Sequence, residues 1–173
     1  MPKKTITAKT ITAKTIAENQ KITLNELEFI EFNSVKEMES VFFLIKQSQT
    51  KLDINSYKEM LSEMISKNNY KMAIISYDKK IIAVAGYFVM TMLYCGRYLQ
   101  ISNLVVDKDF RSLGVGENIL KYFEEKALKI NCNKIVLDSY IENKKSHNLY
   151  YRLGFYVRGF HFMKDITPFT MNY

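Results

Sequence analysis

An arginine and two closely spaced glycines lie in FRSLGVGENIL (110–120), the stretch of the sequence best suited to binding a ligand. A strand-like run precedes the stretch and a helical pattern follows it, so Gly114 and Gly116 lie where a helix begins. Glycine lets backbone N–H groups turn toward a ligand without a Cβ in the way. The helix start adds unpaired N–H donors and a partial positive charge, and Arg111 adds a cation. We therefore expect a phosphate-binding loop, with a plain strand-to-helix turn as the alternative.

Two nucleotide-binding classes compete for this loop. Gly114-Val115-Gly116 begins a dinucleotide-binding G-x-G-x-x-G pattern, and Asp138, at the end of the next predicted strand, lies about where a ribose-binding acid belongs. Ile119 occupies the third glycine position, however, and predicted hairpins precede the unit. Both features argue against the dinucleotide fold. A Walker loop is excluded because no Gly-Lys-Ser/Thr follows the glycines.

A longer pattern favours a different class. LVVDKDFRSLGVGENIL, followed by IVLDSYIENKKSHNLYYRLGF, resembles the GCN5-related N-acetyltransferase (GNAT) superfamily. That family's phosphate motif, Gln/Arg-x-x-Gly-x-Gly/Ala, is matched here by the arginine and the two glycines of the loop. Downstream, Asn143, Tyr150 and Gly154-Phe155 follow at the family's spacing. The resemblance covers roughly residues 26–165.

The resemblance implies acetyl-CoA as cosubstrate. No metal is expected, because the chain has only two histidines and two cysteines without paired-motif spacing. The backbone of 104–106 would pair with the pantetheine arm like an added strand, and the amides of 112–117 would hold the pyrophosphate. Arg111 would contact phosphate or fix the loop, with the loop role favoured; Asn143 would bond the pantetheine arm, cap a helix, or do both. The expected cofactor-binding residues are Leu104, Val105, Val106, Arg111, Ser112, Leu113, Gly114, Val115, Gly116, Glu117 and Asn143.

The reaction implied is direct transfer of an acetyl group from a thioester to a primary amine. The leaving thiolate needs a proton, and a tyrosine is a neutral donor at pH 7. The family places that tyrosine at Tyr150. The alternative for Tyr150 is a packing role, and its neighbour Tyr151 points about 100° away on a helix.

The general base is less clearly indicated. Many members of the family carry a glutamate on the fourth strand, but Ser102 occupies that position here and Gln100 is no substitute. Some relatives that acetylate protein N-termini carry an acid at the position of Asp138. We therefore expect Asp138 to act as the base, directly or through a water. A solvated strand end, the weaker substitute Glu142, and bulk water remain the alternatives.

The acceptor amine cannot be read from the sequence, and a small molecule, a peptide N-terminus or a lysine all fit. Aromatic side chains of the early helices and the last predicted hairpin are candidates for core or for an acceptor pocket: Phe42, Phe43, Tyr57, Tyr87, Phe88, Tyr94, Phe160 and Phe162, together with His161. A non-catalytic CoA-binding or regulatory module of the same fold is the alternative function, motivated by the missing strand carboxylate.

The elements that would position these residues alternate along the chain. Strands are expected at 26–32, 70–77, 81–92, 98–107, 134–140 and 155–164, with a tight turn at 78–80. Capping boxes predict helices over 35–47 (Ser34, Glu37) and from residue 57 (Ser56, Glu59). Apolar residues at helical spacing predict a helix over 115–130, and Gly154 ends one over 143–153. The expected fold is α/β, with a mixed, mostly antiparallel central sheet flanked by helices, in the order β-α-α-β-β-β-α-β-α-β.

Bulk composition is compatible with this assignment. The chain has 173 residues, 47% of them hydrophobic, and a formal net charge of +7. Residues 1–21, a KTITA-repeat tail, carry +4 of that charge, so the body (22–173, one predicted domain) is only mildly basic and a nucleic-acid surface is disfavoured. The two cysteines lack paired-motif spacing, which favours a reducing compartment. No apolar run is long enough to span a membrane and no secretory signal is visible, so a cytoplasmic location is expected. A homodimer is compatible with the sequence.

Overall fold

The computed structural model of the chain describes residues 21–166, with one mixed sheet of five strands in the order β1-β2-β3-β4-β5. Neighbouring strands are antiparallel except β4 and β5, which are parallel, so the predicted mixed, mostly antiparallel α/β fold is confirmed. The strands are β1 (Leu27–Phe32), β2 (Lys71–Tyr77), β3 (Lys80–Met92), β4 (Gly96–Val106) and β5 (Lys134–Leu137). The helices are α1 (Val35–Glu39), α2 (Phe42–Ile45), α3 (Ile54–Asn68), α4 (Val115–Lys129) and α5 (Lys144–Arg152), with 3-10 turns at Leu24–Glu26 and Lys108–Phe110.

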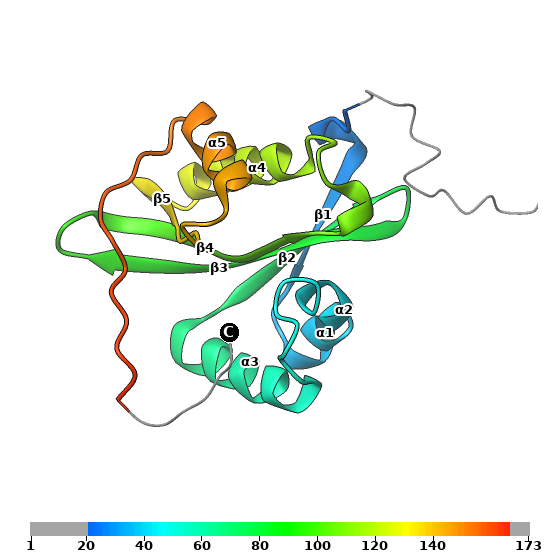
Figure 1. Cartoon of the computed structure of the whole chain (residues 1–173), viewed down its shortest axis with the longest axis horizontal. Helices are drawn as coiled ribbons and strands as arrows, with labels where there is room; N and C mark the ends of the chain where they lie inside the picture. The colour runs from blue at the N-terminus through cyan, green and yellow to red at the C-terminus, as the bar shows by residue number, and fades with distance from the viewer. Residues whose placement is uncertain (1–20, 167–173) are drawn as a thin grey trace, which may run out of the picture.

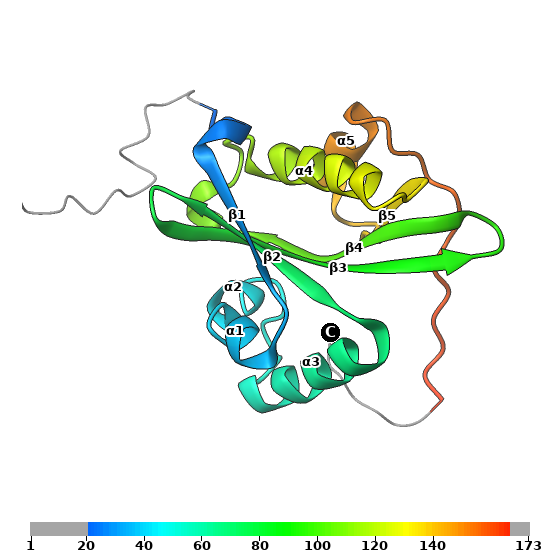
Figure 2. The same cartoon turned by 180° about the vertical axis from the view of Figure 1, so that it is seen from behind.

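Helices cover both faces of the sheet, as Figures 1 and 2 show from opposite sides. α4 and α5 lie on one face, and α1, α2 and α3 lie on the other. The central strands are therefore buried on both sides: β2 sends Met72 and Ile74 toward α1–α3, and Ala73 and Ile75 toward α4. This double burial explains why β2 and β3 are nearly continuous apolar runs. The predicted apolar face of α4 is confirmed, with its buried residues packed on the sheet: Val115, Ile119, Phe123 and Ala127.

The first predicted helix is interrupted. The capping box of Ser34 and Glu37 forms as predicted and starts α1. The single helix expected over 35–47 is wrong, because α1 ends near Ser40, whose hydroxyl donates to the Glu37 carbonyl at 2.6 Å. A serine hydroxyl that bonds a backbone carbonyl competes with the helical hydrogen bonds. Val41 then leaves the helical conformation, and α2 begins after it.

The second capping prediction is also wrong. α3 begins at Ile54, ahead of the expected start. Its cap is Asp53, whose carboxylate accepts the N–H groups of Asn55 and Ser56 at 2.9 and 3.0 Å. Aspartate is as good a cap as serine, and its acceptance of two first-turn N–H groups fixes the earlier start.

The last predicted strand does not form. Residues 155–164 have no strand assignment, and within the described chain residues 156–166 donate no backbone hydrogen bond. The helix before them ends as predicted at Gly154, which adopts φ 84°. From there the segment runs past the end of β5 and the β3–β4 hairpin toward α3, rather than beside a strand (Figures 1 and 2). Local β propensity is satisfied by extended backbone, but a strand also needs a paired neighbour.

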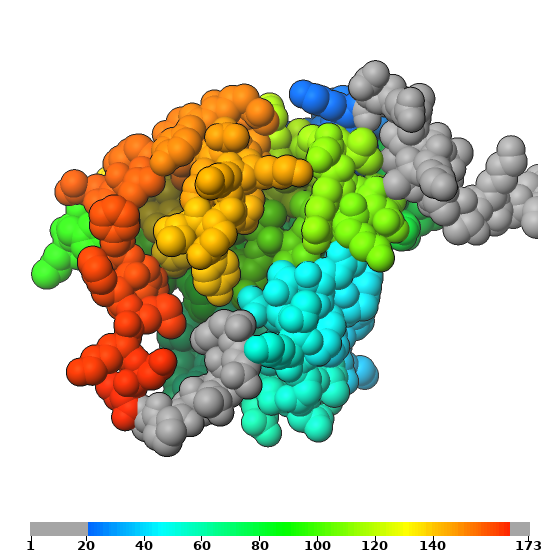
Figure 3. All heavy atoms as spheres, viewed as in Figure 1, coloured from blue at the N-terminus to red at the C-terminus, as the bar shows by residue number. Residues whose placement is uncertain are grey.

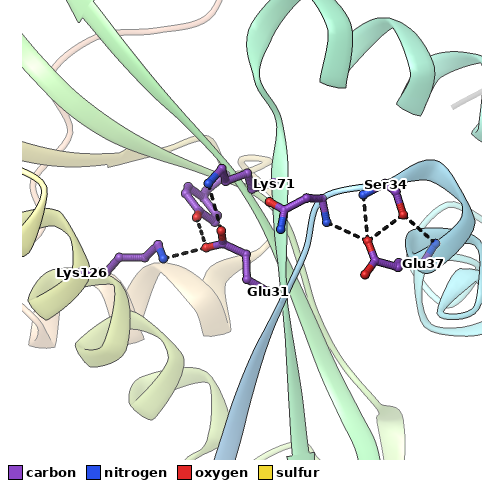
Figure 4. A network of polar contacts seen from close by, with 7 residues as sticks. Glu31, Ser34, Glu37, Lys71 and Lys126 are labelled. Atoms are coloured by element: carbon purple, nitrogen blue, oxygen red, sulfur yellow. Dashed lines mark hydrogen bonds and ion pairs between the residues drawn. The ribbon is translucent and has the colours of Figure 1, made fainter.

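A partly buried ionic network joins β1 to its neighbours. Glu31 lies on the same face of β1 as the inward residues Leu27 and Phe29, and its carboxylate accepts from Lys126 at 2.7 Å and from Lys71 at 3.0 Å (Figure 4). The Tyr87 hydroxyl donates a short hydrogen bond to the same carboxylate. Partial burial acts to raise the pKa of Glu31, but the bonds from Lys126, Tyr87 and Lys71 outweigh it and lower the pKa to about 2. The network ties β1, β2, β3 and α4 together.

Candidate active site

Strands β4 and β5 part at the position predicted for the pantetheine arm. β5 pairs with β4 only over Tyr98–Ile101, whereas β4 continues to Val106 beside β3. Over residues 102–106, therefore, one edge of β4 has no strand neighbour within the described chain. An open β edge presents N–H and C=O groups to an extended ligand. Leu104, Val105 and Val106 all lie on this edge, and their pairing with a pantetheine arm stays a prediction.

The loop before α4 has the geometry of an anion cradle. Ser112 and Gly114 adopt positive φ values of 66° and 86°, and such turns direct successive backbone N–H groups to one side. The N–H groups of 112–117 donate no hydrogen bond to any described residue. The 15-residue α4 begins at Val115, so its positive dipole end lies at the same place. These amides can hold a phosphate, and the loop includes the predicted Leu113, Gly116 and Glu117.

Side chains fix the cradle from outside it. The Arg111 guanidinium donates to the Val106 carbonyl at 3.0 Å, which supports its loop-fixing role. Ile22 is buried, donates its N–H to the Leu113 carbonyl at 2.8 Å, and accepts from the Asn118 side chain at 2.7 Å. The sequence analysis did not predict the hydrogen bond from Asn118. An asparagine on the buried face of a helix indicates such a bond, because buried polar groups are usually paired.

A bulge shapes β4 just before residue 104. The β3–β4 register shifts between Val84 and Gly86, and Asn103 adopts φ 51°. The Asn103 side chain donates to the Tyr70 hydroxyl at 3.2 Å, and Tyr70 is almost fully buried. A Cβ at Gly86 would lie 1.7 Å from the same hydroxyl oxygen. Tyr70, Gly86 and Asn103 thus set where the free edge of β4 begins, and sequence reasoning missed all three.

Tyr150 lies on α5 next to the parted strands. Its ring is half-buried against the core, 5.9 Å from the ring of Phe155. Burial raises the pKa of Tyr150, while hydrogen bonds with Ser146 and Ser139 act to lower it. Because the net direction is upward, the hydroxyl keeps its proton at neutral pH, as a general acid must. Tyr151, by contrast, points to solvent.

Asp138 directly follows β5, at the point where the two strands separate. Gln100 of β4 donates to its Oδ2 at 2.8 Å, and the Nδ1 of His161 lies 4.0 Å from its Oδ1. Its neighbour Ser139 contacts Tyr150, so the predicted acid and base positions are adjacent in the fold. Sequence reasoning had not foreseen that Gln100 would orient this carboxylate.

Asn143 occupies the N-cap position of α5 without capping it. Its side chain makes no cap hydrogen bond, so only its backbone serves the helix, through the His147 N–H at 3.1 Å. The exposed amide is thereby available to a ligand. The Glu117 carboxylate is engaged elsewhere, with Lys121 and Arg152 at 2.9 Å each, so the expected contribution of Glu117 to the cradle is its backbone N–H.

The surface between these elements is hollowed. In Figure 3, green atoms of the sheet lie recessed between the lime loop that precedes α4 and the orange atoms that precede α5. The structure does not bring all the aromatic candidates to this hollow: Tyr57 and Tyr87 are buried in the core. Within residues 21–166 no three histidine, cysteine, aspartate or glutamate side chains are grouped to hold a metal ion. In the same range no helix is both long and apolar enough to cross a membrane.

The sequence pattern described as "Acetyltransferase (GNAT) family" matches residues 32–155, which contain the β4 edge, the loop before α4, Asp138, Asn143 and Tyr150. The chain belongs to this family. It is 26% identical over 137 residues to "Uncharacterized N-acetyltransferase YhdJ" of Bacillus subtilis (strain 168), a match that covers 79% of this chain and 96% of the relative. The GNAT chain is therefore an acetyltransferase, and the relatives do not favour the non-catalytic alternative.

Solved structures share the fold of this GNAT chain. An aminoglycoside acetyltransferase from an uncultured soil metagenomic sample, in complex with sisomicin, superposes with a TM-score of 0.69 at 12% identity, covering 83% of this chain and 98% of that one. A predicted acetyltransferase with acetyl-CoA from Clostridium acetobutylicum superposes with a TM-score of 0.64 at 16% identity, covering 80% and 96%. At these identities the likeness establishes the fold alone.

Proposed function

We propose that this GNAT chain transfers the acetyl group of acetyl-CoA to a primary amine, directly and within a ternary complex. The observation that carries the proposal is the juxtaposition, within residues 21–166, of a β4 edge without a strand neighbour and a loop whose amides have no acceptor, at the start of α4. An extended amide-containing arm that ends in a pyrophosphate matches both features in order along the surface. The solved relative that holds acetyl-CoA supports the same donor.

Different groups of the chain bind different parts of acetyl-CoA. Residues 104–106 offer the backbone edge, and the amides of 112–117 offer the cradle with the dipole of α4 behind it. Arg111 stays on the Val106 carbonyl and keeps the loop shape. The Asn143 amide, which is not used as a cap, bonds the arm from the α5 side.

Tyr150 is the proposed general acid. When an amine nitrogen attacks the thioester carbon, a C–N bond forms and the C–S bond breaks, which leaves a thiolate. The Tyr150 hydroxyl gives its proton to that sulfur. The attacking nitrogen loses a proton to solvent as the amide forms, and Tyr150 recovers one from solvent. Its raised pKa keeps it protonated at neutral pH, which this role requires.

Asp138 is the proposed general base. An ammonium must lose a proton before it can attack, and the Asp138 carboxylate accepts that proton directly or through one water. Gln100 holds one of its oxygens at 2.8 Å, which leaves the other facing His161 and solvent. The acceptor is an amine of a small molecule, a peptide N-terminus or a lysine, and the aminoglycoside enzyme of the same fold makes aminosugars a first choice to test.

Steady-state release of free thiol from acetyl-CoA, measured with a panel of amines, tests the proposal. The panel holds aminoglycosides, aminosugars, lysine peptides and peptides with free N-termini. We expect amine-dependent release with at least one class and saturation in both substrates. Tight acetyl-CoA binding without release on any amine would instead support a non-catalytic module.

A further inference from the structure

The β3–β4 hairpin carries apolar side chains on a face that the helices leave partly open. Tyr87 and Val89 of β3 pack on the α4 side of the sheet, and Phe88 packs on the α1–α3 side. Side chains of a strand alternate between faces, so Met90 and Met92 share the face of Phe88. They are 37% and 39% exposed, because the hairpin reaches past the ends of α1, α2 and α3 (Figures 1 and 2).

This apolar face continues directly to the residue that holds the proposed base. On β4, Gln100 lies opposite Phe88, and Tyr98 lies opposite Met90. The Tyr98 hydroxyl donates to the Met90 sulfur at 3.6 Å. Gln100 in turn donates to the Asp138 carboxylate at 2.8 Å. We call Phe88, Met90, Met92 and Tyr98 the apolar patch; it lies beside the place where the acceptor amine loses its proton.

The charge near the apolar patch suits a single ammonium group. Burial raises the pKa of Tyr98, and among the smaller contributions is the negative charge of Asp138, which places that carboxylate close to the patch. In the part of the chain that the structure describes, no other carboxylate acts on a side chain of the patch. A second ammonium group of an acceptor would therefore lose water against apolar surface without a counter-charge, which is costly.

Carboxylates on the helices of the same side are engaged elsewhere. Glu39 pairs with Lys58 at 3.2 Å, and Glu63 pairs with Lys67 at 2.7 Å. These ion pairs leave the two carboxylates less able to bind an acceptor with several positive charges.

We infer that the acceptor is a monoamine whose amine is attached to an apolar group, and that Phe88, Met90 and Met92 bind that group. The inference rests on the proposed function, because it places the amine at Asp138. Flexible methionine side chains adapt to apolar groups of different shape, so the apolar area of the acceptor matters more than its exact outline. A free alkylamine and the N-terminus of a peptide that begins with an apolar residue share this chemistry.

The first test compares kcat/KM for different amines at saturating acetyl-CoA. The panel holds hexylamine, ethylamine, kanamycin, and two peptides that differ only in an N-terminal leucine or serine. Each buried methylene group contributes roughly fourfold, so hexylamine should exceed ethylamine at least about tenfold even if the patch covers only part of it. The leucine peptide should exceed the serine peptide similarly if the natural acceptor is a peptide, and only hexylamine should show the preference if it is a small molecule.

Substitutions locate the preference. Met90→Gln should lower the ratio of kcat/KM for hexylamine to that for ethylamine about fivefold, and Met90→Leu, which keeps the side chain apolar, should retain the ratio. Met60→Gln is the matched control, because Met60 is a 42% exposed methionine of α3 and lies outside the patch.

Methionine methyl NMR supplies a measurement that does not depend on turnover. Hexylamine titrated into the protein with CoA should shift the methyl signals of Met90 and Met92 and leave that of Met60 in place. Unshifted Met90 and Met92 signals, a preference for kanamycin or ethylamine over hexylamine, or an unchanged ratio in Met90→Gln would each overturn the inference while amine acetylation stands. Absence of thiol release with every amine would overturn the proposed function, and the inference with it.

Discussion

Gly86→Ala provides a stringent test of how the β4 bulge is built. The new Cβ would lie 1.7 Å from the Tyr70 hydroxyl oxygen and 2.3 Å from the ring carbon that carries it. Tyr70 is 1% exposed and packs between the sheet and α1–α3, so it has no free space to enter. The methyl group must therefore displace the ring, and the Asn103 side chain loses its partner on that hydroxyl.

The expected loss of stability combines two effects. Overpacking of a filled core costs about 1 to 3 kcal/mol. Loss of the hydrogen bond between Asn103 and Tyr70 adds about 1 kcal/mol. The total, about 2 to 4 kcal/mol, is a large share of the roughly 5 to 15 kcal/mol that stabilises an ordinary domain. Because the bulge precedes residues 104–106, the acetyl-CoA KM should also rise severalfold.

Urea unfolding of a double-mutant cycle measures the effect. Tyr70→Leu removes the atoms that clash, so Gly86→Ala should be much less harmful in that background, with a coupling of about 1 kcal/mol or more. Gly159→Ala is the matched control, because a Cβ there meets nothing within 4 Å. The reasoning is refuted if Gly86→Ala is as stable as the wild type within about 0.5 kcal/mol.

Four further predictions concern catalysis and pH. Tyr150→Phe should lower kcat more than tenfold with little change in acetyl-CoA affinity, whereas Tyr151→Phe should retain normal turnover; wild-type kcat in the first variant would exclude the acid role. Because burial raises the pKa of Tyr150, the alkaline loss of kcat caused by its ionisation should begin at a higher pH than for an exposed tyrosine; a Tyr150-dependent loss at a lower pH than that would contradict the burial argument. Asp138→Asn should abolish the acidic limb of the pH–rate profile, and an unaltered limb would point to water or another base. The Glu31 carboxylate, whose pKa is lowered to about 2, contributes stability that is full above its unfolded pKa and is lost as the pH falls toward 2. Thermal unfolding of Glu31→Gln should therefore show a lower melting temperature at pH 7 and a weaker loss between pH 5 and 2; an equally steep loss would place the acid sensitivity elsewhere.

The cradle could be predicted because its determinants are local. A positive φ favours glycine, and a helix start leaves backbone amides without helical acceptors. The residue types between Arg111 and Glu117 indicate both properties. The apolar face of α4 is equally local, since helical periodicity alone assigns it. The predicted start of α3 is wrong because two good N-cap residues, Asp53 and Ser56, lie close together in the sequence. The helix uses Asp53.

Contacts between distant residues could not be read in this way. The sequence predicts the strand that contains Glu31, but only the fold shows that Lys126, 95 residues away in sequence, forms an ion pair with it. The bond between Asn103 and Tyr70 spans 33 residues and depends on the β3–β4 register. An asparagine inside an apolar strand, such as Asn103, indicates a bulge with a left-handed residue. It does not indicate that Tyr70 is its hydrogen-bond partner.

The C-terminal segment illustrates a different limit. Its aromatic residues and Val157 predict a strand over 155–164, but the structure has no strand there. Strand assignment also needs a hydrogen-bonded neighbour, which depends on the whole fold and not on the local sequence.

The central claim is that the loop 112–117 holds the pyrophosphate of acetyl-CoA during acetyl transfer. The most direct test compares kcat/KM for acetyl-CoA with kcat/KM for S-acetylpantetheine, which lacks the pyrophosphate, in the wild type and in Gly114→Val. Gly114 adopts φ 86°, which a β-branched residue cannot adopt without strain. The wild type should prefer acetyl-CoA strongly, and the variant should lose at least about tenfold of that preference while still using the short donor. An undiminished preference in a folded variant would contradict the assignment of the cradle.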